Sequence, residues 1–314
     1  MGTGSRSGSA ERTGKTSALS DKGKDLDAIR PDLAEVIERH AFGLDERRPD
    51  VVVRRKHKNQ RTARRNVEDF FDPGFIEYGP LAVAAQRQRR SVEDLIKRTP
   101  ADGLIAGIGT VNGDLFGHDK ARCMVMAYDY SVLAGTQGYF NHKKMDRLLK
   151  LAYEQRLPLV LFAEGGGGRP GDVDAYGVMV AGLDLSTFGS FARLSGWVPV
   201  IGVVSGPCFA GNAALLGCCD VIIATGSSNI GMGGPVMIEG GGLGVFKPED
   251  VGPISSGVNT PSPPPSTMAG PPMPSVVSAV AMITSQQPSS DALPAKQRPE
   301  TMPISGTRAE SWPK

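Results

Sequence analysis

Four short apolar runs, separated by helical patterns, constrain the fold of this chain more than any other feature. The runs are Cys123–Tyr128, Pro158–Ala163, Val198–Val204 and Cys219–Thr225. Each is apolar at nearly every position, which is typical of strands buried on both faces of a sheet. Helical patterns lie between them over Lys143–Arg156, Ser186–Trp197 and Gly211–Gly217. This alternation at βαβ spacing predicts an α/β fold with helices covering the sheet.

The two ends of the chain differ in composition from this middle part. Residues 1–24 hold almost no large apolar side chain, and residues 254–314 carry 12 of the 24 prolines together with many serines. Such segments bury too little apolar surface to offset the entropy lost on ordering. We therefore predict disordered tails at 1–24 and 254–314 and one globular domain over 25–253. Near its start, Pro31 suits the first turn of a helix.

Composition excludes several classes of protein. The net charge is only +2, so no global field favours nucleic acid as a partner. No apolar run reaches the roughly 18 residues of a membrane span, and the N-terminus has no signal-peptide core. The 4 cysteines lack CxxC spacing and resemble reduced core thiols. The sequence predicts a cytoplasmic protein without nucleic-acid or membrane partners.

Glycines gather where the predicted strands end. They form the run Gly165–Gly168 and recur in Ser205–Gly217 and Ile230–Gly244. A tight turn needs only one or two glycines, whereas ligands in α/β proteins bind just beyond strand ends, close to the backbone. His118 and His142, which we place on polar loops, lack metal-ligand spacing, so no metal site is predicted. Stabilisation of negative charge by backbone N–H groups is the chemistry that this pattern favours.

A basic run over Arg54–Gly79 has two interpretations. It is either a solvated helix face or a cationic surface for phosphates, and charge alone favours the solvated face. Arg61, Arg64 and Arg65 are the candidate phosphate contacts.

The segment Tyr128–Asp172 resembles the N-terminal half of the carboxyltransferase component of biotin-dependent acyl-CoA carboxylases. In that family a strand ends in Asp-Ser-Gly-Gly-Ala-Arg, and here the motif reads EGGGGR, Glu164–Arg169. Upstream, ARRNVEDFFDPGFIEYG resembles the family's entry segment, so the resemblance covers about residues 61–253. The family belongs to the crotonase superfamily. The resemblance therefore implies a crotonase-like spiral of ββα units, forming a single N-terminal carboxyltransferase domain.

The resemblance also implies a reaction, the transfer of CO2 from carboxybiotin to the α carbon of acetyl- or propionyl-CoA through a thioester enolate. We predict that Gly166 and Gly167 supply a first oxyanion donor and Gly211 a second. Enoyl-CoA hydratases carry a catalytic glutamate at the position of Ala214, and alanine moves no proton. The predicted substrate contacts are Gly165, Gly168, Arg169, Ala210, Asn212, Gly233, Gly234, Arg61, Arg64 and Arg65. Biotin would arrive on a biotin carboxyl carrier or biotin carboxylase subunit.

Departures from the family pattern leave alternatives open. Gly165 replaces a serine, Gly168 an alanine and Glu164 an aspartate. Family members continue with a second crotonase domain. We expect a carboxyltransferase C-domain or a homo-oligomer as a partner of this chain. Because the family-like sequence passes abruptly into the Pro/Ser-rich tail, we expect a truncation or a frameshifted reading of a longer gene. The alternatives are a non-catalytic fragment that binds acyl-CoA or a partner subunit, and a biotin-independent crotonase-type decarboxylase.

Overall fold

The computed structural model describes residues 29–175 and 186–252, so both predicted tails lie outside the described residues. The chain divides into two units after Glu38. Helix α1 (Pro31–Ala41) contains this division and begins at the predicted proline. The described residues of the first unit are all exposed. The sheet and the candidate sites belong to the second unit, Arg39–Lys314.

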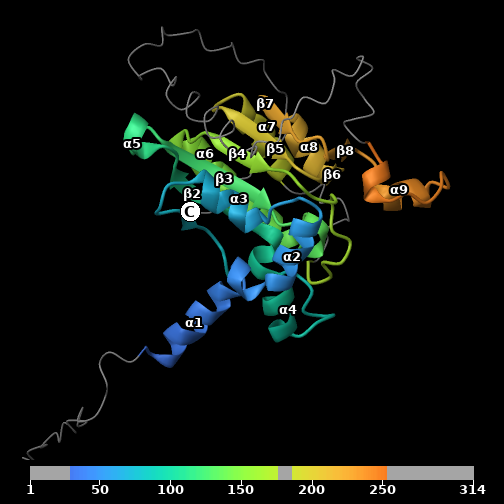
Figure 1. The fold of residues 1–314 in the computed structure, drawn as a ribbon, viewed down its shortest axis with the longest axis horizontal. Coiled ribbons are helices and arrows are strands. Elements are labelled where there is room, and N and C mark those ends of the chain that lie inside the picture. Colours follow the sequence, from blue (N-terminus) through green and yellow to red (C-terminus); the bar gives the residue numbers. More distant parts are fainter. Residues whose placement is uncertain (1–28, 176–185, 253–314) are drawn as a thin grey trace, which may run out of the picture. The chain divides into compact units, whose positions relative to one another are not determined.

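A mixed sheet forms the centre of the second unit (Figure 1). Its strands, in spatial order, are β1 (Ile76–Glu77), β2 (Leu104–Thr110), β3 (Arg122–Tyr128), β4 (Leu159–Phe162), β5 (Val200–Val204) and β7 (Val221–Ala224). The first three are antiparallel, whereas β3, β4, β5 and β7 run parallel. Strands β6 (Pro207–Phe209) and β8 (Asn229–Gly231) form a separate parallel pair. The α/β class predicted from the sequence is confirmed.

Helices connect and cover these strands. They are α2 (Pro49–His57), α3 (Ala63–Phe70), α4 (Val92–Arg98), α5 (Gly113–Phe116), α6 (Tyr139–Gln155), α7 (Thr187–Ser195), α8 (Gly211–Gly217) and α9 (Pro235–Gly240). Short 3-10 turns lie at Asp45–Arg47, Pro100–Gly103, Leu133–Gly135 and Pro248–Asp250. Local signals fix several starts: Pro49 opens α2, and the hydroxyl groups of Thr62 and Ser91 cap α3 and α4.

Both faces of the central strands are buried, as the continuous apolar runs predict. Successive side chains of a strand point to opposite faces. Met124 and Met126 of β3 belong to a core with α6, α7 and α8, whereas Val125 packs on the other side with Val67 and Phe70 of α3. The sheet is therefore held between two apolar cores.

Strand β7 is an exception, and the prediction that Cys219–Thr225 is buried on both faces is wrong. The strand lies at the edge of the sheet, where Val221 and Ile222 remain 42% and 48% exposed. Ile223 is partly buried against the α3-side core. An apolar run shows that a strand suits burial, but the fold decides whether another element covers it.

Strand β2 has no counterpart among the predicted strands, because two glycines interrupt its apolar pattern. A Cβ at Gly107 would lie 2.1 Å from the carbonyl oxygen of Ile76, and one at Gly109 would lie 2.6 Å from the ring of Phe71. The glycines thus let the segment between α3 and β1 cross the strand at close range.

All four cysteines are free, in agreement with the predicted reduced thiols. Cys123 and Cys208 are buried, and burial raises the pKa of Cys208 to about 12. Cys218 and Cys219 are partly exposed rather than core residues. Across residues 29–175 and 186–252, no helix combines the length and apolar character that crossing a membrane requires.

Candidate functional site

Three segments meet where β4 ends. The glycine run Gly165–Gly168 follows β4, the loop 133–138 follows β3, and Phe209–Gly211 leads from β6 into α8. We call the residues 134–137, 165–168 and 210–211 the glycine platform.

Hydrogen bonds hold the glycine run on both sides. The Gly165 N–H donates to the carbonyl of Pro207 at 2.8 Å, and the Phe209 N–H donates back to Gly165 at 2.8 Å. On the opposite side, the Gln137 N–H donates to the carbonyl of Gly167 at 2.7 Å. The run is thus a fixed backbone surface rather than a loose turn.

Close packing explains why several platform positions are glycine. A Cβ at Gly165 would lie 2.2 Å from Nδ2 of Asn212, and one at Gly211 would lie 1.9 Å from Oε1 of Gln137. Gly167 has a φ of +89°, which a side chain would strain. Gly166 differs, because it is exposed and its Cβ would meet nothing closer than 3.2 Å. A ligand can therefore approach the backbone at Gly166.

The two amides predicted as first-loop donors are already engaged within the protein. The Gly166 N–H donates to the carbonyl of Ala134 at 2.9 Å, and the Gly167 N–H donates to Oδ1 of Asn212 at 2.9 Å. The N–H groups of Ala134, Gly168 and Gly211 donate no hydrogen bond to another described residue. Gly211 thus keeps its predicted availability, and Ala134 is a candidate donor that the sequence did not reveal. Its left-handed backbone, with φ of 55°, is not readable from an alanine.

Arg169 braces the platform from inside, which corrects its predicted contact with substrate. Its guanidinium is buried, forms ion pairs with Asp102 and Asp172, and donates to the carbonyl of Thr136 at 2.7 Å. The Gln137 carbonyl accepts the backbone N–H of Arg169 at 2.9 Å. Side chain and backbone together tie the loop 133–138 to the glycine run.

The three arginines predicted to contact phosphates occupy different environments. Arg64 is buried and donates to Glu77 at 2.7 Å, which assigns its side chain to packing between α3 and β1. Arg61 and Arg65 both pair with Asp69 and stay more exposed. Phosphate binding by Arg61 and Arg65 stays a prediction.

An ion pair that the sequence did not indicate joins α2 to the platform. Nη1 and Nη2 of Arg55 donate to the two carboxylate oxygens of Glu164 at 2.7 and 2.6 Å. Arg55 also donates from Nε to the carbonyl of Arg61 at 2.8 Å. The family pattern has aspartate at this position, and the longer side chain of Glu164 extends to the guanidinium of Arg55. Its neighbour Arg54 pairs with Asp50 on the surface. The sequence of the basic run gives no sign of which arginine is buried.

A buried polar network lies beneath the loop 133–138. Nε2 of Gln137 donates to the hydroxyl of Tyr128 at 3.0 Å, and that hydroxyl donates to the sulfur of Met145 at 2.8 Å. Burial raises the pKa of Tyr128, so its phenol stays protonated and keeps both roles. Asn212 is also fully buried, so it lacks the access that its predicted contact with substrate requires.

The other predicted substrate contacts lie along the approach to α8 and α9. Ala210 has an unusual backbone, with φ of 48° and ψ of −118°, and its N–H donates to the carbonyl of Gly231 at 2.9 Å. Such strained positions are frequent at functional sites. Gly233 and Gly234 follow β8, and Gly234 precedes α9. Their part in a coenzyme A cleft stays a prediction.

Neither His142 nor Ala214 supplies an acid-base group to the platform. His142 lies inside α6 rather than on a polar loop, and burial lowers its pKa to about 4. Ala214 occupies the second turn of α8. Among residues 29–175 and 186–252, no group of three or more His, Cys, Asp or Glu side chains could hold a metal ion. The platform therefore offers backbone donors as its chemistry.

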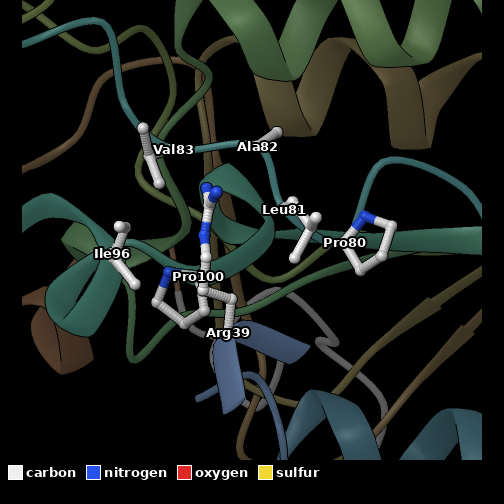
Figure 2. A pocket seen from close by; sticks show the side chains of 7 residues that line it. All are labelled: Arg39, Pro80, Leu81, Ala82, Val83, Ile96 and Pro100. Atoms are coloured by element: carbon white, nitrogen blue, oxygen red, sulfur yellow. The ribbon is translucent and has the colours of Figure 1, made fainter. Parts of the chain in front are cut away.

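A separate pocket of about 180 Å³, open solvent included, is lined by Arg39 and six apolar residues. Figure 2 shows the Arg39 guanidinium rising among Pro80, Leu81, Ala82, Val83, Ile96 and Pro100. Small-molecule sites usually combine apolar walls with several convergent polar groups, whereas Arg39 is the one polar side chain in the lining of this pocket. The glycine platform is therefore the stronger candidate.

Comparison with known proteins identifies similar sequences. The carboxyl transferase domain family matches residues 54–254, which enclose the whole platform. The chain is 28% identical over 188 residues to a propionyl-CoA carboxylase beta chain from Saccharopolyspora erythraea, covering 60% of this chain and 32% of that protein. It is 28% identical over 195 residues to the methylmalonyl-CoA carboxyltransferase 12S subunit of Propionibacterium freudenreichii, covering 60% and 33%. The chain thus spans about a third of these relatives' length.

Solved structures give similar matches. A single-chain, multi-domain long-chain acyl-CoA carboxylase is 63% identical, with a TM-score of 0.67 over 73% of this chain and 22% of that one. A transcarboxylase 12S structure with methylmalonyl-CoA and methylmalonic acid bound is 23% identical, with a TM-score of 0.57 over 73% of this chain and 43% of that one. The crotonase-like α/β fold is confirmed.

Proposed function

Because this chain belongs to the carboxyl transferase domain family, we propose that it forms the acyl-CoA-binding half of a biotin-dependent carboxyltransferase. The observation that carries the proposal is the family match over residues 54–254. In the reaction, the α carbon of an acyl-CoA loses a proton, its electron pair spreads onto the thioester oxygen, and the carbon then bonds to CO2. Carboxybiotin, carried by a partner protein, would supply the CO2 group, and the biotin left after CO2 release would be the base that takes the α proton.

The platform's part is to hold negative charge on the thioester oxygen. We assign this task to the N–H groups of Gly211 and Ala134, which donate no hydrogen bond to another residue that the structure describes. Loss of one such donor typically costs about 100- to 1,000-fold in rate. The exposed backbone at Gly166 fits the approach of a flat group, because no side chain stands there. Arg61 and Arg65 are the proposed contacts for coenzyme A phosphates.

The proposed substrate is a long-chain acyl-CoA rather than acetyl- or propionyl-CoA. Support comes from the 63% identity to a long-chain acyl-CoA carboxylase, far above the 28% identity to the propionyl-CoA relative. A carboxyltransferase C-domain or further copies of the chain would complete the enzyme.

Calorimetric titration of the full chain with CoA, acetyl-CoA and palmitoyl-CoA tests this function, with palmitoyl-CoA kept below its micelle concentration. We expect palmitoyl-CoA to bind at least 10-fold more tightly than acetyl-CoA. Gly211→Pro should weaken the binding of the two acyl-CoA thioesters, because it removes an N–H and places carbon atoms against Gln137. Gly217→Ala on the same helix meets nothing within 4 Å and should bind normally. A folded wild-type chain that binds no acyl-CoA would exclude the proposal.

A further inference from the structure

Asn212 connects two segments of the glycine platform through one buried side chain. Its Oδ1 accepts the N–H of Gly167 at 2.9 Å, and its Nδ2 donates to the carbonyl of Gly135 at 3.4 Å. The side chain has no exposed surface. The contact with Gly167 lies on the run after β4, and the contact with Gly135 lies on the loop after β3.

The two contacts have opposite polarity, and a neutral amide of this size satisfies both. An ionised aspartate offers acceptors alone, so it would keep the bond from Gly167 and repel the carbonyl of Gly135. A leucine of similar volume offers neither, so it would leave the Gly167 N–H buried without this acceptor. The space is also tight, because a Cβ at Gly165 would lie 2.2 Å from Nδ2 of Asn212.

Asn212 directly follows Gly211, the residue with the available N–H. The Cβ position of Gly167 lies 3.5 Å from the Gly211 nitrogen, so the loops and this donor sit within contact distance. An oxyanion is stabilised only when its donors lie about 2.7–3.1 Å from one point. A small shift of either loop would therefore take a donor out of range.

We propose that Asn212 is a positioning residue for the carboxyltransferase site: it sets the spacing between Ala134 and Gly211 by holding both glycine-bearing loops. This inference rests on the proposed function and assigns Asn212 no contact with the substrate. Loss of the Asn212 side chain should therefore weaken binding of the charged thioester oxygen but not binding of the coenzyme A body.

The test measures two affinities on the full chain. One ligand is CoA, and the other is a nitroalkyl-CoA whose nitronate places negative charge where the enolate oxygen forms. In Asn212→Leu we expect nitronate affinity to fall at least 10-fold while CoA affinity changes less than 3-fold. Amide hydrogen exchange at Gly167 should be faster in Asn212→Leu but not in Asn212→Asp, which keeps the acceptor.

Asn229→Leu is the matched control. Asn229 is also a buried asparagine, and its Nδ2 donates to the carbonyls of Glu249 and Val251 at 2.7 and 3.2 Å. This variant should lower the unfolding temperature but leave the ratio of the two affinities unchanged. An unchanged ratio in folded Asn212→Leu would overturn the inference and leave the proposed function intact. A wild-type chain that binds neither ligand would overturn both.

Discussion

Removing Arg55 tests whether its buried ion pair anchors the glycine platform. The side chains of Arg55 and Glu164 are only 10% and 7% exposed, and two hydrogen bonds join them. In Arg55→Met the carboxylate of Glu164 would stay buried without its counter-charge. Breaking one side of such a pair typically costs about 3–5 kcal/mol. That is a large share of the roughly 5–15 kcal/mol by which a domain is stable.

The neighbouring residue on the same helix provides the control. Arg54 pairs with Asp50 at 2.8 Å, but both side chains are more than half exposed, at 66% and 68%. Arg54→Met should therefore cost less than about 1 kcal/mol. The double variant Arg55→Met/Glu164→Leu should recover most of the loss, because it removes both buried charges and keeps apolar volume.

Urea unfolding followed by circular dichroism measures these free energies, and thermal unfolding provides a second readout. At roughly 2–4 °C per kcal/mol, the unfolding temperature of Arg55→Met should fall by roughly 6–20 °C. The pair is not an anchor if Arg55→Met lowers the free energy of unfolding no more than Arg54→Met does. The same conclusion follows if the double variant is less stable than Arg55→Met alone. The reasoning from burial would then be refuted.

Three further predictions concern packing and protonation, and urea unfolding checks each. Gly107→Ala should lower the free energy of unfolding by about 1–3 kcal/mol, because its Cβ would lie 2.1 Å from the Ile76 carbonyl oxygen. In Gly189→Ala, on α7, the added Cβ meets nothing within 4 Å, so this variant should be slightly more stable than the wild type. Burial lowers the pKa of Lys144 from 10.5 to about 8, so the unfolded chain binds more protons between these values. Wild-type stability relative to Lys144→Met should therefore rise across pH 8–10.5, by an amount on the order of 3 kcal/mol, and a flat difference would contradict this assignment. Burial lowers the pKa of His142 from 6.5 to about 4, so stability should fall as the pH drops through this window, and less so in His142→Gln; equal acid sensitivity would exclude the effect.

The sequence by itself determined the α/β class, the central strands with the helices between them, and the place of the candidate site. Continuous apolar runs located β3, β4 and β5, since residues that suit burial on both faces leave a local mark. The glycine run after β4 located the platform in the same way. A run of glycines can be recognised directly in the sequence, and it marks backbone that has no Cβ.

The tertiary structure alone decided which groups in the platform are available. The N–H groups of Gly166 and Gly167 are engaged by Ala134 and Asn212, and Arg169 faces inward to Asp102. The sequence also gave no means of separating Arg55, which pairs with a carboxylate 109 positions away, from its neighbour on the surface. Apolar periodicity is local, whereas a hydrogen bond or ion pair depends on which distant segment the fold brings within about 3 Å.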